Sequence, residues 1–170
     1  MRSPDEHFPG WKEKEAAMAT WAETSRKAGP VTFTACSLDG KPFELMLESV
    51  RVPFEPSCYQ GDGTETRLTI CFSGADEELR RQLLAMEESV GATCSCLKDD
   101  LVKAKVNIDK VRCYNANKAR IETPKSMRGW SVCARLHLRG SWATRQGSGL
   151  SLEATDLQFL QEASEPPCPF

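Results

Sequence analysis

The sequence has no run of about 18 uncharged apolar residues, the length that a membrane-spanning helix needs. Its first thirty residues contain several acidic side chains and no continuous apolar block, so we predict no secretory signal. Histidine is scarce: His7 and His137 are the only two, and neither has a recognisable nucleophile partner. We therefore expect an intracellular protein, nuclear or cytoplasmic, that is not secreted, does not contact membranes and is not an enzyme.

The eight cysteines do not have the spacing of a metal site or of a disulfide framework. A structural zinc site usually supplies two C-x2-C pairs, because four ligands must converge tetrahedrally. Here only Cys94 and Cys96 are close together, and nothing near them would stabilise a thiolate. Cys71 and Cys133 lie in apolar runs and are expected to be buried as small hydrophobic side chains. We expect no metal, no cofactor and no redox pair.

The length of 170 residues fits one domain, and a composition of 40% hydrophobic and 27% charged residues is typical of globular proteins. We expect a flexible N-terminus over residues 1–9 and a single domain over residues 10–162. A C-terminal tail is expected over residues 163–170, which contain three prolines.

The net charge of −2 conceals a strong separation of charge along the chain. Residues 97–145 contain twelve Lys or Arg and four Asp or Glu, which gives +8; the remainder has 10 basic and 20 acidic residues, which gives −10. This asymmetry favours a localised surface that binds a polyanion. Scattered solubilising charge is the alternative.

Hydrophobic periodicity predicts a chain made mainly of strands, with helices over residues 10–27 and 76–90. In one expected strand the apolar residues change parity between Leu47 and Val50, which predicts either a β-bulge or a sharp coil of a curved strand there. The expected strands cover residues 31–36, 43–52, 67–72, 101–113, 118–122, 130–142 and 150–160.

Successive side chains of a strand point to opposite faces, so the basic residues of segment 130–142 share one face and its apolar residues share the other. Lys103 and Lys105 form a similar row on an earlier strand. Segment 130–142 contains no acid, whereas an ordinary solvated face would mix both signs of charge. Trp130 and Trp142 bracket the segment and are candidates for base stacking, or else residues of the core or its rim.

The stretch from Ser126 to Gln161 resembles the closing hairpin of the OB-fold single-stranded-DNA-binding proteins of phages and large DNA viruses. In that hairpin a basic-studded apolar strand ends at a Trp-containing turn, and Gly-Leu begins the last strand. The matching positions here are Leu138, Trp142, Gly149, Leu150, Leu157 and Gln158, and the resemblance covers about residues 100–162. It implies a mainly β fold with α: a five-stranded OB-like Greek-key barrel with one helix between strands 3 and 4, plus an N-terminal helix.

We therefore expect a non-catalytic protein that binds single-stranded nucleic acid in replication, recombination or repair, with DNA as the preferred ligand and RNA as the alternative. The alternative is a protein-interaction module whose basic face binds an acidic partner, such as a replication protein, or a second copy of the chain as a homo-oligomer. The expected binding residues are Lys103, Lys105, Lys118, Arg120, Lys125, Arg128, Trp130, Arg135, His137, Arg139, Trp142 and Arg145.

Overall fold

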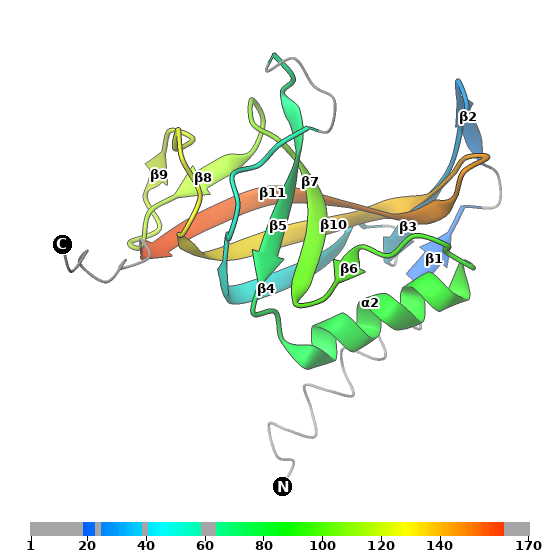
Figure 1. Ribbon diagram of the computed structural model, residues 1–170, viewed down its shortest axis with the longest axis horizontal. Coiled ribbons are helices and arrows are strands. Elements are labelled where there is room, and N and C mark those ends of the chain that lie inside the picture. Colours follow the sequence, from blue (N-terminus) through cyan, green and yellow to red (C-terminus); the bar gives the residue numbers. More distant parts are fainter. Residues whose placement is uncertain (1–18, 23–24, 39–40, 59–63, 162–170) are drawn as a thin grey trace, which may run out of the picture.

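The computed structural model of the protein describes residues 19–22, 25–38, 41–58 and 64–161. In these residues one sheet of eleven strands carries one helix (Figure 1). The flexible N-terminus expected over residues 1–9 and the tail expected over residues 163–170 lie outside the described residues. Within them, no helix is long and apolar enough to cross a membrane.

The strands follow the alternating segments of the sequence, and two long strands at the end of the chain form the backbone of the sheet. The short strands are β1 (Ala19–Trp21), β2 (Arg26–Ala28), β6 (Leu97–Lys98), β8 (Arg112–Tyr114) and β9 (Arg120–Ile121). The longer strands are β3 (Val31–Leu38), β4 (Phe43–Arg51), β5 (Arg67–Ser73), β7 (Leu101–Asn107), β10 (Ser131–Ala143) and β11 (Ser148–Gln161).

Five of these strands close into a ring of pairings in the order β10, β4, β5, β7, β11 and back to β10. All of the pairs are antiparallel except β7 with β11, which is parallel. β3 continues the sheet beyond the ring, because the far end of β10 leaves β4 and pairs with β3 from Gly140 to Ala143. β2 pairs with β3, and together they form an arm beside the end of the β10–β11 hairpin (Figure 1).

The core lies inside this ring and consists of the apolar side chains at alternate positions of each strand. On β10, for example, Val132, Ala134, Leu136 and Leu138 are all fully buried, while the residues between them reach the outer face. Phe43, Phe72 and Leu157 add large side chains from other strands of the ring. The basic residues of β10 and β7 therefore point away from the core.

A β-bulge in β4 explains the change of parity in the sequence. Val132 is paired with Val50 and Ala134 with Leu47, so two steps on β10 match three steps on β4. Ser49 takes up the extra residue with a φ of 52°, and both Leu47 and Val50 remain buried. Of the two explanations for the change of parity between Leu47 and Val50, the structure therefore shows the bulge.

Gly140 allows β10 to move from β4 to β3. A β-carbon at this position would lie 2.0 Å from the carbonyl oxygen of Thr34 on β3, far inside van der Waals contact. The register between β10 and β11 also shifts between Leu138 and Gly140. Only a residue without a side chain fits this close crossing of two backbones.

The helix α2 (Glu77–Ser89) begins after Asp76 and has Glu77 and Glu78 in its first turn, where negative charge is favourable. Its apolar stripe, Leu79, Leu83 and Met86, joins the core cluster. In Figure 1 the helix runs beneath β6.

The prediction of a mainly β fold with α is confirmed, but several of its details are wrong. The described residues hold eleven strands instead of five, and α2 lies between β5 and β6 instead of between strands 3 and 4. Within the predicted N-terminal helix over residues 10–27, Ala19–Trp21 and Arg26–Ala28 are strands, because both segments pair with β3. Ala22 and Ser25 belong to neither a helix nor a strand, and residues 10–18, 23 and 24 lie outside the described residues.

The prediction of a single strand over residues 101–113 is also wrong, because the structure has two strands there. A turn at Asn107, whose carbonyl accepts from the backbone N–H of Val111 at 2.8 Å, separates β7 from β8. Both strands nevertheless run parallel to β11, β7 at Glu153 and β8 at Asp156.

Candidate nucleic-acid interface

A groove of about 800 Å³ lies between the β2–β3 arm and the outer face of β5 and β7, with β10 and β11 contributing to its floor. We call it the basic groove. Its lining contains six cationic side chains and one carboxylate, Glu153, which leaves a formal charge of +5. The cations are Arg26, Arg67, Lys103, Lys105, Lys110 and Arg139.

The outward-facing positions of β5 and β7 supply three of the six cations, Arg67, Lys103 and Lys105. Thr69 faces Lys105 and Cys71 faces Lys103 across the antiparallel pair. The Nζ atom of Lys105 donates to the hydroxyl of Thr69 at 2.8 Å, which holds the ammonium group against the strand. Among the described residues, neither lysine is within ion-pair distance of a carboxylate, so both charges are available to a ligand.

Two aromatic side chains face the groove from the opposite side. The guanidinium of Arg26 on β2 lies 5.3 Å from the centre of the Phe33 ring on β3, in cation–π geometry. Trp142 lies across the strand pair from Gly149, where a β-carbon would be 3.1 Å from the indole ring. The glycine therefore lets the half-buried indole lie against the backbone of β11.

The floor of the groove contains an ion pair between neighbouring strands. Arg139 on β10 donates through Nε and Nη2 to the two carboxylate oxygens of Glu153 on β11, at 2.9 and 2.8 Å. Glu153 is in turn the register partner of Lys105 on β7. One acid thus lies between two of the cations that the sequence predicts for binding.

The loop before β6 forms another wall of the groove and is fixed from both sides. The buried carboxylate of Glu87 on α2 accepts from the hydroxyl of Ser95 at 2.7 Å and from the backbone N–H of Cys96 at 2.8 Å. The carbonyl of Ser148 accepts from the N–H groups of Thr93 and Cys94 at 3.1 and 2.8 Å. The helix and the last strand therefore position this wall together.

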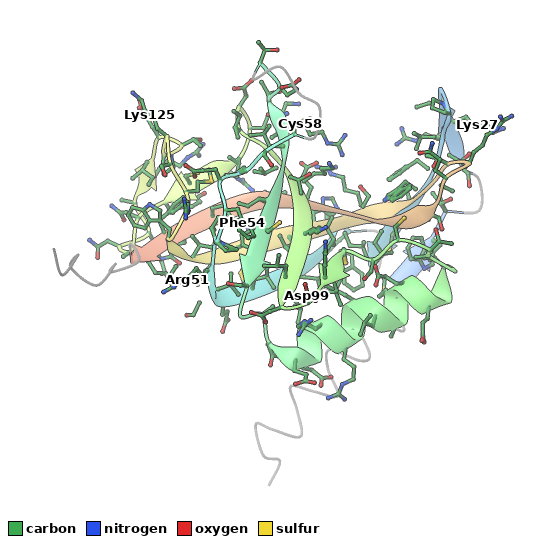
Figure 2. The ribbon with its side chains drawn as sticks, viewed as in Figure 1. Lys27, Arg51, Phe54, Cys58, Asp99 and Lys125 are labelled. Atoms are coloured by element: carbon green, nitrogen blue, oxygen red, sulfur yellow. The ribbon has the colours of Figure 1, made fainter. Side chains whose placement is uncertain are left out.

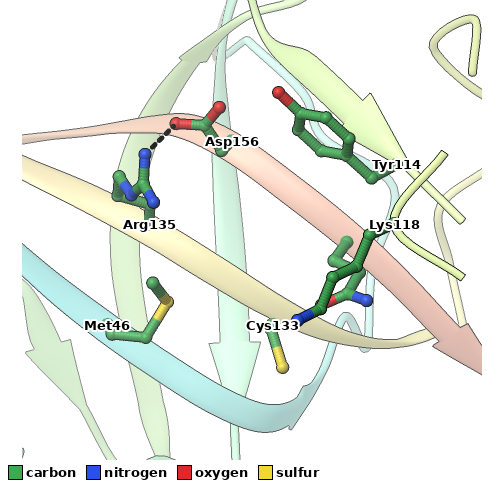
Figure 3. A pocket seen from close by; sticks show the side chains of 7 residues that line it. Met46, Tyr114, Lys118, Cys133, Arg135 and Asp156 are labelled. Atoms are coloured by element: carbon green, nitrogen blue, oxygen red, sulfur yellow. Dashed lines mark ion pairs between the residues drawn. The ribbon is translucent and has the colours of Figure 1, made fainter. Parts of the chain in front are cut away.

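A second cavity, of about 350 Å³, lies on the other part of the outer face of β10, between β4 and the β8–β9 turn (Figure 3). We call it the Tyr114 cavity. It contains two of the predicted binding residues, Lys118 and Arg135. Its lining consists of Met46, Tyr114, Lys118, Cys133, Arg135, Asp156 and Gln158.

Lys125 and Arg128 belong to the loop before β10, which lies away from the basic groove. Glu55 holds this loop in place. Figure 2 shows Lys125 at the opposite end of the molecule from Lys27 on the β2–β3 arm. The carboxylate of Glu55 accepts from the hydroxyl of Ser126 at 2.7 Å and from the N–H groups of Met127 and Arg128 at 2.7 and 2.9 Å.

These contacts change the acidity of Glu55. The bond from Ser126, the largest cause, lowers its pKa, as do the two backbone amides and the charge of Arg128, while partial burial opposes them. The carboxylate therefore stays ionised below its ordinary range and keeps the loop closed around it.

Other predicted residues also lie outside the basic groove. The Trp130 ring packs edge-on against buried Phe159, with 5.4 Å between ring centres, and so belongs to the rim of the core. The guanidinium of Arg120 lies 5.8 Å from the centre of the Tyr114 ring. Arg145 is exposed in the β10–β11 turn.

His137 lies on the outer face of β10 between Arg135 and Arg139. Burial, and then the charge of Arg139, lower its pKa below the ordinary value of 6.5, and Glu44 and Glu153 oppose this. At neutral pH its imidazole is therefore uncharged, and His137 does not add to the positive charge of this face.

The prediction that Cys71 and Cys133 are buried is wrong. Both thiols are only half-buried, because they have the outward parity of β5 and β10, whereas Cys36 and Cys113 are buried. Burial, and after it the neighbouring Glu87 carboxylate, raise the pKa of Cys96 to about 12, which disfavours a reactive thiolate there.

The sequence prediction missed four groove residues: Arg26, Phe33, Arg67 and Lys110. Arg67 has the same parity as Thr69 and Cys71, so strand alternation alone could have placed it on the outer face. Lys110 lies in the turn after β7, and Arg26 falls in the segment predicted to be helical. Nothing in the local sequence indicates that these two turn toward β5.

No family model and no curated protein matches the chain. It is similar in structure to the single-stranded DNA-binding protein from bacteriophage Enc34 in complex with ssDNA, with a TM-score of 0.50 and 12% identity over 86% of this chain and 100% of that chain. A C-terminal truncation of the same phage protein gives a TM-score of 0.51, with 12% identity over 85% of this chain and 98% of that one. The resemblance predicted from the sequence is confirmed as a similarity of fold.

Proposed function

We propose that the protein binds single-stranded DNA in the basic groove, without catalysis, and that its closed ring of strands is an OB-like Greek-key barrel. The main support is the convergence of six cations from four strands and one turn around a single groove, with only one carboxylate in the lining. Single-strand binders combine such a cationic groove with aromatic platforms. Trp142 and Phe33 supply aromatic rings here.

The phage protein whose fold this chain shares is described as single-stranded DNA-binding, and one of its structures is a complex with ssDNA. This agrees with the ligand that the charge and the aromatic rings favour. A protein with this activity would cover exposed strands during replication, recombination or repair.

Only some of the binding residues that the sequence predicts line the basic groove. In the groove, Lys103, Lys105 and Arg139 would contact phosphates and Trp142 would stack on a base. Arg26, Arg67 and Lys110 join them as phosphate contacts. Lys125, Arg128, Trp130 and Arg145 are outside the groove lining and are not part of this proposal.

Fluorescence anisotropy with a labelled oligothymidylate at two salt concentrations tests this function. Affinity should fall by about 0.7 log unit per contacted phosphate for each tenfold increase in salt, because bound cations release counterions from the strand. The double variant Lys103→Ala/Lys105→Ala should bind more weakly and show a shallower salt slope. Lys98→Ala, on exposed β6 and outside the groove, is the matched control.

Binding that does not depend on salt, or equal affinity of the double variant and the wild type, would overturn the proposal. Gel filtration at low and high salt examines the alternative, an interaction module. Salt-sensitive oligomers together with no oligonucleotide binding would replace the DNA-binding proposal with self-association through opposite charges.

A further inference from the structure

The Tyr114 cavity combines positive charge, an aromatic ring and an exposed thioether, and the basic groove does not include it. We propose that this cavity is a second subsite, which holds one nucleotide unit of the strand that is bound in the basic groove. The inference rests on the proposed function and adds to it a longer path for the strand and a second place where a base stacks.

The charges around the cavity favour a phosphate. The Asp156 carboxylate is engaged by Arg112, through Nε at 2.7 Å and Nη2 at 3.0 Å, and by Nη1 of Arg135 at 3.5 Å. Arg135 also lies 3.9 Å from the exposed carboxylate of Glu44. With Lys118 and Arg120 counted, four cations surround two carboxylates, which gives a formal charge of +2. An anionic group can therefore bind without displacing the pair between Arg112 and Asp156.

The walls of the cavity suit a base. The Tyr114 ring lines one side, with the Arg120 guanidinium 5.8 Å from its centre, and such a ring is a platform for stacking. Met46, on β4, lines the cavity with its thioether and is 46% exposed, which is unusual for a side chain of this type. In Figure 3 Met46 lies below Arg135, and Asp156 lies between Arg135 and Tyr114.

The turn between β8 and β9 holds Lys118 in place in spite of backbone strain. Lys118 has a φ of +64°, the left-handed region that glycine adopts without cost. The side chain of Asn115 accepts from the N–H groups of Asn117 and Ala119 at 2.9 and 3.0 Å, and Gln158 donates to the carbonyl of Ala116 at 3.3 Å. A charged side chain at a position that favours glycine indicates that the side chain has a function.

The outer face of β10 connects the two sites. Arg139 lines the groove, Arg135 lines the cavity, and His137 lies between them on the same face. Four residues of antiparallel strand span about 13 Å. This corresponds to roughly four stacked nucleotides at about 3.4 Å each. A strand that leaves the groove at Arg139 therefore reaches the cavity within a few nucleotides.

The test measures affinity for oligothymidylates of increasing length with the wild type, Lys118→Gly and Tyr114→Leu. Glycine at position 118 removes the charge and also relieves the strained φ, so this variant keeps the turn folded. We expect both variants to bind short oligonucleotides as the wild type does. For long ones, Lys118→Gly should bind roughly fivefold more weakly, with a salt slope that is shallower by about 0.7. Lys125→Ala is the control for a cation outside both sites.

Nuclear magnetic resonance of ring-labelled tyrosine gives a direct readout, because the chain has only two tyrosines, Tyr59 and Tyr114. The signal of Tyr114 is the one that is missing from the spectrum of Tyr114→Leu. Its chemical shift should change when a long oligonucleotide is added and should stay the same with a short one. If the wild type binds no oligonucleotide, the proposed function itself fails. If the wild type binds but both variants match it at every length, the second subsite is wrong and the groove remains.

Discussion

Arg139 and Glu153 form a bidentate ion pair across β10 and β11, with N–O distances of 2.9 and 2.8 Å, in the floor of the basic groove. The guanidinium that a phosphate would contact is thus already bound to a carboxylate of the same chain. Lys105, on the other side of Glu153, is its register partner. A bound strand therefore has to compete with Glu153 for Arg139.

The variant Glu153→Gln should bind single-stranded DNA more tightly, by roughly fivefold at low salt, since the groove changes from +5 to +6. The loss of stability should be small, about 0.2–1 kcal/mol, because the pair is partly exposed. Anisotropy titrations measure the affinity and urea unfolding measures the stability. Glu88→Gln, on the exposed side of α2, is the control; unchanged or weaker binding by Glu153→Gln would contradict competition by this carboxylate.

DNA binding should become tighter as the pH falls toward the pKa of His137. In the free protein, burial and Arg139 hold this pKa below 6.5, so the imidazole is neutral at pH 7. A phosphate next to His137 would raise the pKa, because it stabilises the protonated form. Affinity should therefore be constant at high pH, rise as pH falls through the pKa of the complex, and level off below that of the free protein. The affinity of His137→Gln should depend less on pH than that of the wild type. If the two proteins show the same dependence of affinity on pH, no phosphate lies beside His137.

The two tryptophans of β10 and its preceding loop should respond differently to substitution. Trp142→Leu should weaken binding by about 1–3 kcal/mol and leave the salt slope unchanged, because stacking releases no counterions. Trp130→Leu should lower the free energy of unfolding, because its ring packs on Phe159, and should leave the affinity unchanged. Anisotropy and urea unfolding of both variants measure these effects. If Trp130→Leu weakens binding and Trp142→Leu does not, then Trp130 is the stacking residue instead of Trp142.

Glu55 should stabilise the loop before β10 only while it is ionised. Its folded-state pKa lies below the ordinary 4.5, so its contribution is present above that value and is lost as pH falls through the folded-state pKa. Glu55→Gln should therefore reduce the free energy of unfolding at pH 7 by about 1 kcal/mol, a value reduced for solvent screening. Below the folded-state pKa the two proteins should be equally stable. Urea unfolding at several pH values measures this, and a difference that does not vary with pH would contradict it.

Gly140→Ala should destabilise the fold by more than about 2 kcal/mol, because a β-carbon would lie 2.0 Å from the Thr34 carbonyl oxygen. Neither backbone can move without disturbing the pairing between β3 and β10. The neighbouring substitution Ser141→Ala should change stability by less than about 0.5 kcal/mol and serves as the control. Similar thermal midpoints for Gly140→Ala and the wild type would show that the two strands can separate at this point.

Local patterns predicted much of the fold. Alternation gave the positions of the long strands, and the change of parity between Leu47 and Val50 located the bulge in β4. The residues before β3 were misinterpreted because their apolar spacing fits a helix, whereas pairing with β3 makes Ala19–Trp21 and Arg26–Ala28 strands. Such pairing depends on contacts between distant segments, which local periodicity does not contain.

The charge of the binding face was only partly predictable. β10 itself contains no acid, but β11 brings Glu153 and Asp156 beside Arg139 and Arg135. The sign of a sheet surface depends on the register between strands as well as on the sequence of each one. The predicted cations also do not gather in one place: Lys103, Lys105 and Arg139 line the basic groove, Lys118 and Arg135 line the Tyr114 cavity, and Lys125, Arg128 and Arg145 line neither.

Two joins of the five-strand ring contain few residue pairs: Arg51 with Ser73 between β4 and β5, and two parallel pairs between β7 and β11. The β5–β7 pair is therefore bordered by two weak seams, and hydrogen exchange should be fastest there among the strands of the ring. The floor of the basic groove crosses one of these seams, because Lys105 and Glu153 lie on either side of it. A strand of DNA that contacts both Lys105 and Arg139 would hold the β5–β7 pair against the rest of the molecule and so stiffen the protein that binds it.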